Sequence, residues 1–591
     1  MVKLCKQVLY CCYLIMIIFN IISVNSHNLK KCGHYERALH SKSTKVNYYG
    51  DEHSEISKLR YLQAAWEPLR MYIDYSILDS QTTVDIAKRN AIHQVVDATK
   101  AMFEKLLMVK RMTTKLQVTQ CNADTTIISN DVQAGVDADI VIFPMFDLKA
   151  GEGVEASAVH CIQDSVTNRP TAGSMHYAVP TVDPTKKNYM DYLIMLTFHE
   201  MTHVLVFNDS LYDGFIDSSG NQIPIAQTIG SQTINGVTRK MVTSPKVVAT
   251  AKSHFGCTSI TGMELENQGG SGTAGAHWEM RTMLGDFMIG ESYEENVISE
   301  ISLAFYEDSG WYKVNYYTGG LFRFGKYKGC DFVLAKCIVN EKSSFPGTFC
   351  TETDARMCTA SRMAKGTCSL QDGSGQSVDA AYKYFASGKI GTTNADFCPI
   401  SSSAGDGLSY FTQVCFEGTS SLPTSLNEVI GADSSCFYSS IKDTNNTEQS
   451  AISANYSICY KYACDNTAKT VSVTIGTQVV SCPKVGGPVD VTVGTNTGKL
   501  WCPDYNLICT KSVPCSGAVD CVMKGSSPLS PTYDYTALAT NPFGTDSGSA
   551  AIPSPSPVPA GTPGTGVSTT NGNTIKILSF IFYFLIISLF A

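Results

Sequence analysis

The sequence predicts an α+β fold, with a first domain of mixed strands and helices and a second part rich in cysteine. Two observations carry this prediction. Helical periodicity and short apolar runs alternate within the first 200 residues, which is typical of helices packed on a mixed sheet. Cysteine is sparse up to Cys257 and then dense, with 15 cysteines from Cys330 to Cys521. A loop-rich module joined by disulfides is therefore expected to follow the first domain.

Composition narrows the class of protein. Of 591 residues, 43% are hydrophobic and 17% are charged, and the net charge is −8. A nucleic-acid-binding protein would need a basic patch, and a disordered chain would need more charge, so we expect neither. The 22 cysteines lack the repeated CxxC spacing of a zinc ribbon, which favours disulfides and an oxidising compartment.

The two ends of the chain carry targeting patterns. Lys3 and Lys6 precede an apolar run, which predicts a signal peptide over residues 1–26, with an uncleaved signal anchor as the alternative. Residues 526–576 are rich in Pro, Ser, Gly and Thr, which predicts a stalk. The final apolar run, residues 577–591, is short for a membrane-spanning helix and ends the chain. It is typical of a removed GPI-signal tail, with a C-terminal span as the alternative. We therefore expect passage through the secretory pathway to the cell surface.

Four elements are expected within the first 207 residues. Residues 69–78 are expected to form a strand, and residues 81–112 carry apolar side chains at helical spacing, which predicts a long helix. An uninterrupted apolar run from Ile140 to Phe143 predicts a buried strand over residues 138–145. Residues 189–207 are again helical, and Pro184 is placed to start that helix.

The motif that carries chemistry lies on the second of these helices, at His199-Glu200-Met-Thr-His203. On a helix, His199 and His203 lie one turn apart on one face, so both imidazoles can bind one metal ion. Glu200 is turned about 100° away from His199, and can instead reach a water on that metal. Neutral imidazoles suit zinc, which lowers the pKa of its water toward ~7. We therefore expect one Zn²⁺ per chain, with Glu200 as the general base.

A catalytic zinc needs a third protein ligand and one open position. The histidines that follow His203 are His254 and His277. His254 is expected to be a surface histidine on a helix. His277 follows a glycine-rich run, residues 269–275, which lets backbone pass close to a metal, so His277 is the expected third ligand. HExxH also occurs by chance, and a glutamate ligand in place of His277 would first be sought at Glu264.

The two-part histidine motif resembles that of the leishmanolysins, which are metzincin zinc proteases of trypanosomatid surfaces with relatives in many eukaryotes. His199-Glu-x-x-His203 is followed, after 73 residues, by Gly-Thr-Ala-Gly-Ala-His277-Trp-Glu-Met-Arg. In most metzincins the third histidine lies six residues beyond the second, whereas leishmanolysins carry a large insertion there. Further segments that resemble the family are residues 66–70, 138–142, 169–173, 255–257, 308–312 and 501–505.

The resemblance implies a metzincin-like catalytic domain, a large insertion and a cysteine-rich C-terminal domain. The implied bounds are a propeptide at 27–60, an N-terminal catalytic subdomain with the zinc helix at 61–207, an inserted subdomain at 208–276, a region with the third ligand and the Met-turn at 277–330, and the cysteine-rich domain at 331–525. Met288 is implied as the Met-turn residue, an apolar floor under the zinc. Cys32 is implied as a propeptide thiol that caps the zinc and keeps the precursor latent.

Cysteine parity agrees with an unpaired Cys32. Three of the 22 cysteines leave with the signal peptide, and setting Cys32 aside leaves 18, an even number. Of these, three precede Cys330 and 15 lie from Cys330 onward, so at least one disulfide must join the two groups. We hypothesise that Cys121 pairs with Cys161 and that Cys257 pairs with Cys330.

One position departs from the family pattern. The family usually has glycine three residues after the second histidine, where this chain has Val206, so the helix is expected to run further before it turns. Glycosylation sequons stand at Asn208, Asn445 and Asn455, and Asn208 is close enough to the zinc helix that its use is not expected.

The function expected from these patterns is a surface-displayed zinc endopeptidase that acts on protein or peptide substrates. The alternative is a catalytically weak or inactive surface adhesion glycoprotein that keeps the fold, and Val206 is its only support. No nucleic-acid partner is expected, and the sequence leaves the oligomeric state open.

Overall fold

The computed structural model describes residues 31–32, 43–50, 54–150, 153–185, 189–270, 273–291, 296–315, 322–353, 356–360, 362–402, 414–416, 418–420, 424–443, 456–484 and 486–509. The predicted signal peptide, stalk and C-terminal tail lie outside these residues, as do the sequons at Asn445 and Asn455. Among the helices of these described ranges, none combines the length and the apolar character needed to cross a membrane.

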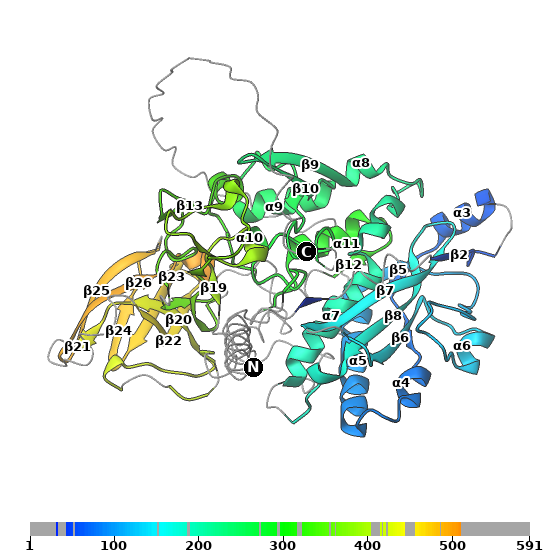
Figure 1. Cartoon of the computed structure of the whole chain (residues 1–591), viewed down its shortest axis with the longest axis horizontal. Helices are drawn as coiled ribbons and strands as arrows, with labels where there is room; N and C mark the ends of the chain where they lie inside the picture. Colours follow the sequence, from blue (N-terminus) through cyan, green and yellow to red (C-terminus); the bar gives the residue numbers. More distant parts are fainter. Residues whose placement is uncertain are drawn as a thin grey trace, which may run out of the picture. The chain divides into compact units, whose positions relative to one another are not determined.

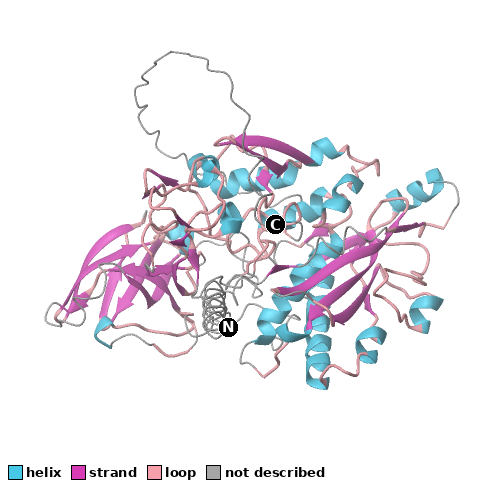
Figure 2. Cartoon of the chain, in the orientation of Figure 1, coloured by secondary structure: helices cyan, strands magenta, loops and turns pink. Residues whose placement is uncertain are grey.

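A mixed six-stranded sheet underlies the first part of the chain (Figure 1, Figure 2). Its order is β1 (Lys31–Cys32), β7 (Val154–Asp164), β8 (Pro170–Ala178), β6 (Ile140–Asp147) and β4 (Met71–Ile73), and β2 (Thr44–Val46) also pairs with β7. β7 is antiparallel to β8, whereas β8, β6 and β4 are parallel. Nearly every residue of β6, β7 and β8 is buried, which explains why β6 is a continuous apolar run. The mixed sheet confirms the expected fold class.

Two long helices, α5 (Ile86–Leu106) and α7 (Tyr189–Leu205), contact each other beside the sheet, and α7 also contacts β7 and β8 (Figure 1). α5 begins where the Asp85 carboxylate accepts the N–H of Ala87. It ends where Leu107 becomes extended and enters β5 (Leu107–Lys110), which pairs with β3 (Trp66–Pro68) and β12 (Lys313–Val314). A long helix within residues 81–112 is thus confirmed, but it is shorter than expected because the residues after Leu106 pair as a strand.

The strand expected over residues 69–78 is wrong beyond Ile73, because the chain turns there and forms α4 (Ser76–Ser80). Asp74 accounts for the break. Its carboxylate accepts the N–H of Ser76 at 3.0 Å and the N–H of Ser129 at 2.8 Å. Such side-chain bonds to nearby N–H groups compete with a sheet ladder and favour a turn.

The segment between the two parts of the histidine motif forms a small sheet and several helices. The sheet has the order β11 (Met263–Glu264), β10 (Val237–Val242), β9 (Ile229–Ile234). The helices here and up to residue 334 are η2 (Asp209–Gly214), α8 (Ile225–Thr228), α9 (Pro245–Phe255), α10 (Met280–Met283), α11 (Glu300–Asp308) and α12 (Cys330–Leu334). Earlier short helices are α3 (Ser54–Gln63), α6 (Asn130–Ala134) and η1 (Val179–Thr181).

The C-terminal part is built mainly from antiparallel strands. A seven-stranded sheet contains β20 (Ser434–Ser439), β21 (Lys442–Asp443), β22 (Tyr456–Asp465), β23 (Thr470–Ile475), β24 (Gln478–Ser481), β25 (Gly487–Val493) and β26 (Asn496–Cys502). Small elements before and after it are β13 (Ile338–Val339), β14 (Lys342–Ser343), β15 (Arg356–Cys358), β16 (Lys365–Cys368), β17 (Gln371–Asp372), η5 (Ala380–Tyr382), β18 (Lys389–Ile390), η6 (Thr393–Ala395), β19 (Ser401–Ser402), η7 (Thr424–Leu426) and α15 (Tyr505–Ile508). This sheet has its own apolar core, whereas the larger core runs from Tyr48 to Ile400.

Disulfides join the elements of both parts. The two hypothesised bonds, Cys121–Cys161 and Cys257–Cys330, are confirmed. The others found in the described ranges are Cys337–Cys398, Cys350–Cys368, Cys358–Cys436, Cys415–Cys459, Cys464–Cys509 and Cys482–Cys502. As expected from parity, Cys257–Cys330 joins the sparse and the dense cysteine groups.

Candidate metal centre

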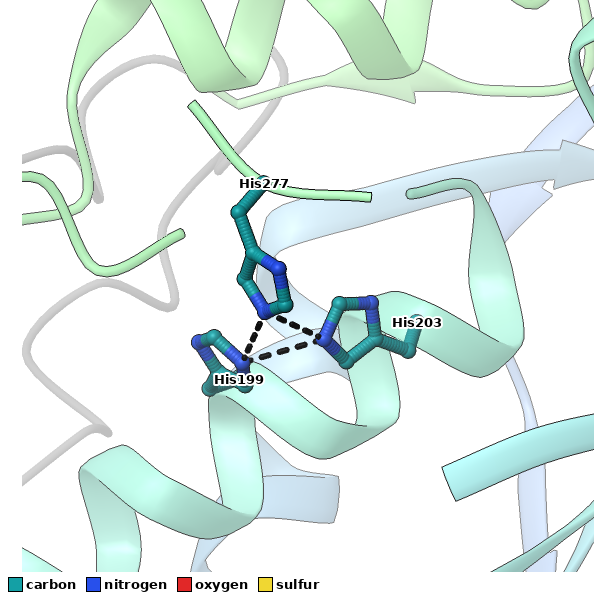
Figure 3. A group of neighbouring side chains, drawn as sticks. All are labelled: His199, His203 and His277. Carbon is teal, nitrogen blue, oxygen red and sulfur yellow. Dashed lines mark hydrogen bonds between the residues drawn. The ribbon is translucent and has the colours of Figure 1, made fainter. Parts of the chain in front are cut away.

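Three histidines from two distant segments meet at one point (Figure 3). His199 and His203 come from α7, and His277 comes from the loop before α10. Their Nε2 atoms are 3.0 Å apart between His203 and His199, 3.1 Å between His203 and His277, and 3.2 Å between His277 and His199. His203 and His277 are fully buried, and His199 is 7% exposed.

The hydrogen bonds of the other ring nitrogen explain this convergence. Each Nδ1–H donates to a main-chain carbonyl: His199 to Phe287 at 2.6 Å, His203 to Phe207 at 2.7 Å and His277 to Thr273 at 2.8 Å. A carbonyl oxygen only accepts, so the proton is on Nδ1 and each Nε2 presents a lone pair. Three lone pairs that face one another repel each other, whereas a cation between them would attract all three.

The distances also fit a metal ion. In a tetrahedral site with Zn–N bonds of about 2.05 Å, two ligand nitrogens lie about 3.3 Å apart. The Nε2 separations of 3.0 to 3.2 Å are close to this value. The donor set, the tautomers and the spacing therefore suit one tetrahedral ion held by three neutral imidazoles.

The loop of His277 is held by backbone bonds on both sides. The His277 carbonyl accepts the N–H of Glu266 at 2.9 Å, and the Trp278 N–H donates to the Met288 carbonyl at 2.9 Å. Gly290 makes the close approach possible, since a Cβ at this position would lie 2.0 Å from the Thr273 methyl group. The glycine-rich run before His277 contributes Gly275, whose φ of 83° favours glycine.

The end of α7, the helix that carries His199 and His203, differs from the expectation drawn from Val206. α7 ends at Leu205, so the expectation of a longer helix is wrong. Val206 needs no positive φ, because the N–H groups of both Val206 and Phe207 donate to the Thr202 carbonyl at 2.9 Å. The Tyr312 hydroxyl then donates to the Leu205 carbonyl at 3.2 Å, which satisfies the helix end.

Glu200 is fully buried on the same helix. Burial, and in smaller measure the negative charge of Glu200, raises the pKa of the neighbouring Tyr177 hydroxyl, which is 2.9 Å from Thr197 Oγ1. Tyr177 therefore stays neutral beside the carboxylate. This pair of elements, β8 and α7, packs closely, and a Cβ on Gly173 of β8 would meet Val204 of α7 at 2.4 Å.

Main-chain carbonyls of the segment around Met288 accept hydrogen bonds from His199 and from the residue after His277. The Phe287 carbonyl accepts from His199, and the Met288 carbonyl accepts from the residue that follows His277. Met288 is fully buried. Cys32 forms β1 with Lys31 and lies opposite Ala156 of β7, while its side chain is outside the described part of the chain.

Two other expectations are corrected or settled by the contacts. His254 lies on a helix, α9, but it is buried rather than on the surface, and its Nε2 lies 2.8 Å from the Phe324 carbonyl. Glu264 does not join the histidines. Its carboxylate pairs with Arg239, and with Arg281 at 3.2 Å, in a buried network.

That network contains a second group of carboxylates, Glu264, Glu279 and Asp396, whose oxygens lie within 4.8 Å of one another. Arg239 Nη2 lies 2.8 Å from Asp396, so the two arginines already supply positive charge to the group. Sequence patterns did not indicate this network, because its members come from four separate segments. It ties the region after His277 to the cysteine-rich part.

The contacts of Asn208 bear on the expectation that its sequon is not used. Asn208 is fully buried, and its side-chain oxygen accepts the N–H of Ser210 at 3.1 Å and the Ser210 hydroxyl at 2.7 Å. This bond caps η2 directly after α7. A glycan on Asn208 would therefore require this turn to open.

Comparisons with known proteins agree with the site. A family model described as leishmanolysin, peptidase M8, matches residues 79–515, well over half of the chain. The chain is 28% identical over 397 residues to a leishmanolysin homolog of Crithidia fasciculata, which covers 65% of this chain and 56% of the relative. It is 28% identical over 466 residues to a leishmanolysin-like peptidase of Caenorhabditis elegans, covering 66% of this chain and 69% of the relative. A leishmanolysin-like peptidase of Drosophila melanogaster is 34% identical over 211 residues, 31% of either chain.

The alignment spans little more than half of the length of the Crithidia relative. The residues matched by the family model include all three histidines and Glu200. With a mixed sheet, a helix that carries HExxH and a distant third histidine at the same point, the chain belongs to the leishmanolysin family.

Proposed function

We propose that this protein is a zinc-dependent endopeptidase that hydrolyses peptide bonds in proteins. The observation that carries the proposal is the convergence of three Nε2 lone pairs, each directed by an Nδ1–H bond to a carbonyl. His199, His203 and His277 are the proposed ligands, and Zn²⁺ is the proposed ion because neutral imidazoles at tetrahedral spacing suit it.

Different residues of the chain have different roles in the proposed hydrolysis. When bound, zinc supplies a Lewis acid and lowers the pKa of a water toward ~7. Glu200 accepts a proton from the attacking water at a carboxylate oxygen and returns it to the nitrogen of the leaving amine. Each of the three histidines would present Nε2 to the ion while its Nδ1–H stays bonded to a main-chain carbonyl. Met288, which is fully buried, is proposed to form an apolar floor under the ion.

We further propose that Cys32 keeps the precursor latent by ligating the metal. Sheet register supports this. Cys32 pairs with Ala156 of β7, Ala156 pairs with Tyr177 of β8, and the Tyr177 hydroxyl lies against Thr197, two residues before His199. Cys32 is therefore two strand spacings from Tyr177, on the order of 10 Å, and level with the metal-binding turn of α7.

The segment removed on activation is proposed to end before Ser43. Tyr48 and Tyr49 are buried in the larger core, and Arg60 donates to the Tyr49 carbonyl at 2.8 Å. Cleavage at residue 60 would leave that core open. Cleavage before residue 43 would release Cys32 and keep β2 paired with β7.

Secretion and display on the cell surface through a GPI anchor complete the proposal. They rest on the sequence patterns at the two ends. The eight disulfides within the described ranges support an oxidising compartment.

Two substitutions test the catalytic assignment. Glu200→Ala is expected to keep zinc and lose casein hydrolysis, because the base is removed and the ligands stay; His277→Ala is expected to lose both. Glu67→Ala, which removes a half-exposed carboxylate paired with Arg111, is the matched control and is expected to keep both. Metal content and hydrolysis with and without a chelator are measured. Wild-type hydrolysis by Glu200→Ala would refute the assignment, and an inactive, zinc-free wild-type protein would favour the adhesion alternative.

A further inference from the structure

The turn that contains Met288 is connected to two of the three proposed ligands. The Phe287 carbonyl accepts the His199 Nδ1–H at 2.6 Å. The next carbonyl, of Met288, accepts the N–H of Trp278, the neighbour of His277, at 2.9 Å. The position of this turn therefore decides how His199 is oriented and where the segment of His277 lies.

One buried carboxylate holds the turn in place. Asp286 is fully buried, and its Oδ1 accepts the Met288 N–H at 2.7 Å. The Ser302 hydroxyl of α11 donates to the same carboxylate, with distances of 3.0 Å to Oδ1 and 2.8 Å to Oδ2. Asp286 follows Gly285, whose φ of 90° gives the tight turn its shape.

Ser302 extends this connection to the other ligand segment. Its oxygen accepts the indole Nε1–H of Trp278 at 2.8 Å. Trp278 and Ser302 are both buried, so the bonds are shielded from water. Asp286 is thus joined to the segment of His277 through Ser302 and Trp278, and to His199 through the turn of Phe287.

A carboxylate is better suited than an amide to this place. Both of its oxygens accept, and it receives an N–H and an O–H as charge-assisted bonds, which are about twice as strong as neutral ones. An amide retains one accepting oxygen and brings an NH₂ group toward donors. The loss would be transmitted to His199 and to the His277 segment, and also to the start of α11, where Ser299 bonds to the same carboxylate.

We propose that Asp286 is a positioning residue of the metal centre, which holds the Met288 turn so that His199 and His277 face the ion. The proposal rests on the proposed function, in that these histidines bind zinc. It assigns to Asp286 no contact with substrate or metal. Groups that orient metal ligands typically change metal affinity by 10- to 100-fold when they are removed.

The test compares three variants of the full secreted protein. Asp286→Asn removes the carboxylate, and Ser302→Ala removes the hydroxyl that donates to Asp286 and accepts from Trp278. Asp308→Asn is the matched control. Asp308 is a mostly buried carboxylate on the same helix as Ser302, and it accepts from Ser244 at 2.6 Å and from the N–H groups of Lys246 and Val247 at 3.1 and 2.9 Å. These bonds cap α9 and have no such connection to the histidines.

Zinc affinity is measured in buffers of defined free zinc, and the visible spectrum of the Co²⁺-substituted protein reports ligand geometry. Asp286→Asn is expected to bind zinc 10- to 100-fold more weakly with an altered Co²⁺ spectrum, and Ser302→Ala to change both less; Asp308→Asn is expected to keep both. A wild-type affinity and spectrum for Asp286→Asn would overturn the proposal, as would an equal loss in Asp308→Asn. If Asp286→Asn is not secreted, Ser302→Ala decides, and its wild-type behaviour would overturn the proposal. A wild-type protein that binds no zinc would instead refute the proposed function.

Discussion

The Cys257–Cys330 disulfide is expected to support both the fold and the metal centre. Its cysteines are 73 residues apart, and the loop between them contains His277 and Met288. Closing a loop of that length stabilises the folded state by roughly 4 kcal/mol on the chain-entropy estimate. We predict that the double variant Cys257→Ser/Cys330→Ser has a free energy of unfolding lower by most of this amount. It is also expected to be secreted less.

The same variant is expected to lose zinc, for a local reason. Cys330 begins α12, and Arg281 donates to three carbonyls at the end of that helix, those of Phe332, Val333 and Ala335 at 3.2, 2.6 and 3.4 Å. Arg281 is four residues beyond His277. Release of α12 therefore reaches the loop of the third ligand.

A second disulfide separates the two effects. Cys482–Cys502 lies in the C-terminal core, spans 20 residues and is expected to contribute roughly 3 kcal/mol. Cys482→Ser/Cys502→Ser should lower the free energy of unfolding by a similar amount while keeping zinc. Urea unfolding and the zinc retained in a chelator buffer are the measurements. Equal zinc loss in both double variants, or full retention by the first, would refute the reasoning.

Three further predictions concern pH, latency and anchoring. Burial, with Lys326 adding repulsion, lowers the pKa of His254 from 6.5 to about 3. The folded state thus binds this proton less tightly than the unfolded state, so the stability that His254 contributes is full above pH 6.5 and falls as pH drops toward 3. About 2 kcal/mol should be lost by pH 5, and urea unfolding should show a weaker pH dependence for His254→Gln. A mercurial should activate the precursor by taking the Cys32 thiolate off zinc, and thiol mapping that finds Cys32 in a disulfide would exclude this. Phosphatidylinositol-specific phospholipase C should release the protein from cells, and a peptide from residues 577–591 in the mature protein would contradict a GPI anchor.

Sequence patterns predicted those helices and strands whose formation depends mainly on residues that are close in the sequence. The buried run from Ile140 and the periodic helix that became α5 are local signals. The ends of elements were predicted less well. Asp74 ends a strand by bonding to Ser129, 55 residues away, and Leu107 leaves a helix to pair with distant strands. Such partners are set by the tertiary fold and have no signature in the local sequence.

The proposed ligands followed from the motif, but the groups that orient them did not. His199, His203 and His277 were expected together, and the structure brings them together. Their Nδ1 partners are main-chain carbonyls, which every residue possesses, so no residue type marks them. His254 was expected on the surface of a helix, whereas the Phe322 ring stacks on its imidazole and the Phe324 carbonyl lies 2.8 Å from its Nε2.

The use of carbonyl groups as Nδ1 partners has a consequence for how the sequence can change over time. A carboxylate partner would disappear with a single codon change, whereas the carbonyls of Phe207, Thr273 and Phe287 survive replacement of their side chains. Only the backbone conformation at these three residues has to be conserved. Divergent relatives can therefore exchange the residues around the histidines and keep the same imidazole tautomers, provided that the turns remain. Insertions or deletions near these turns should be far more harmful than substitutions.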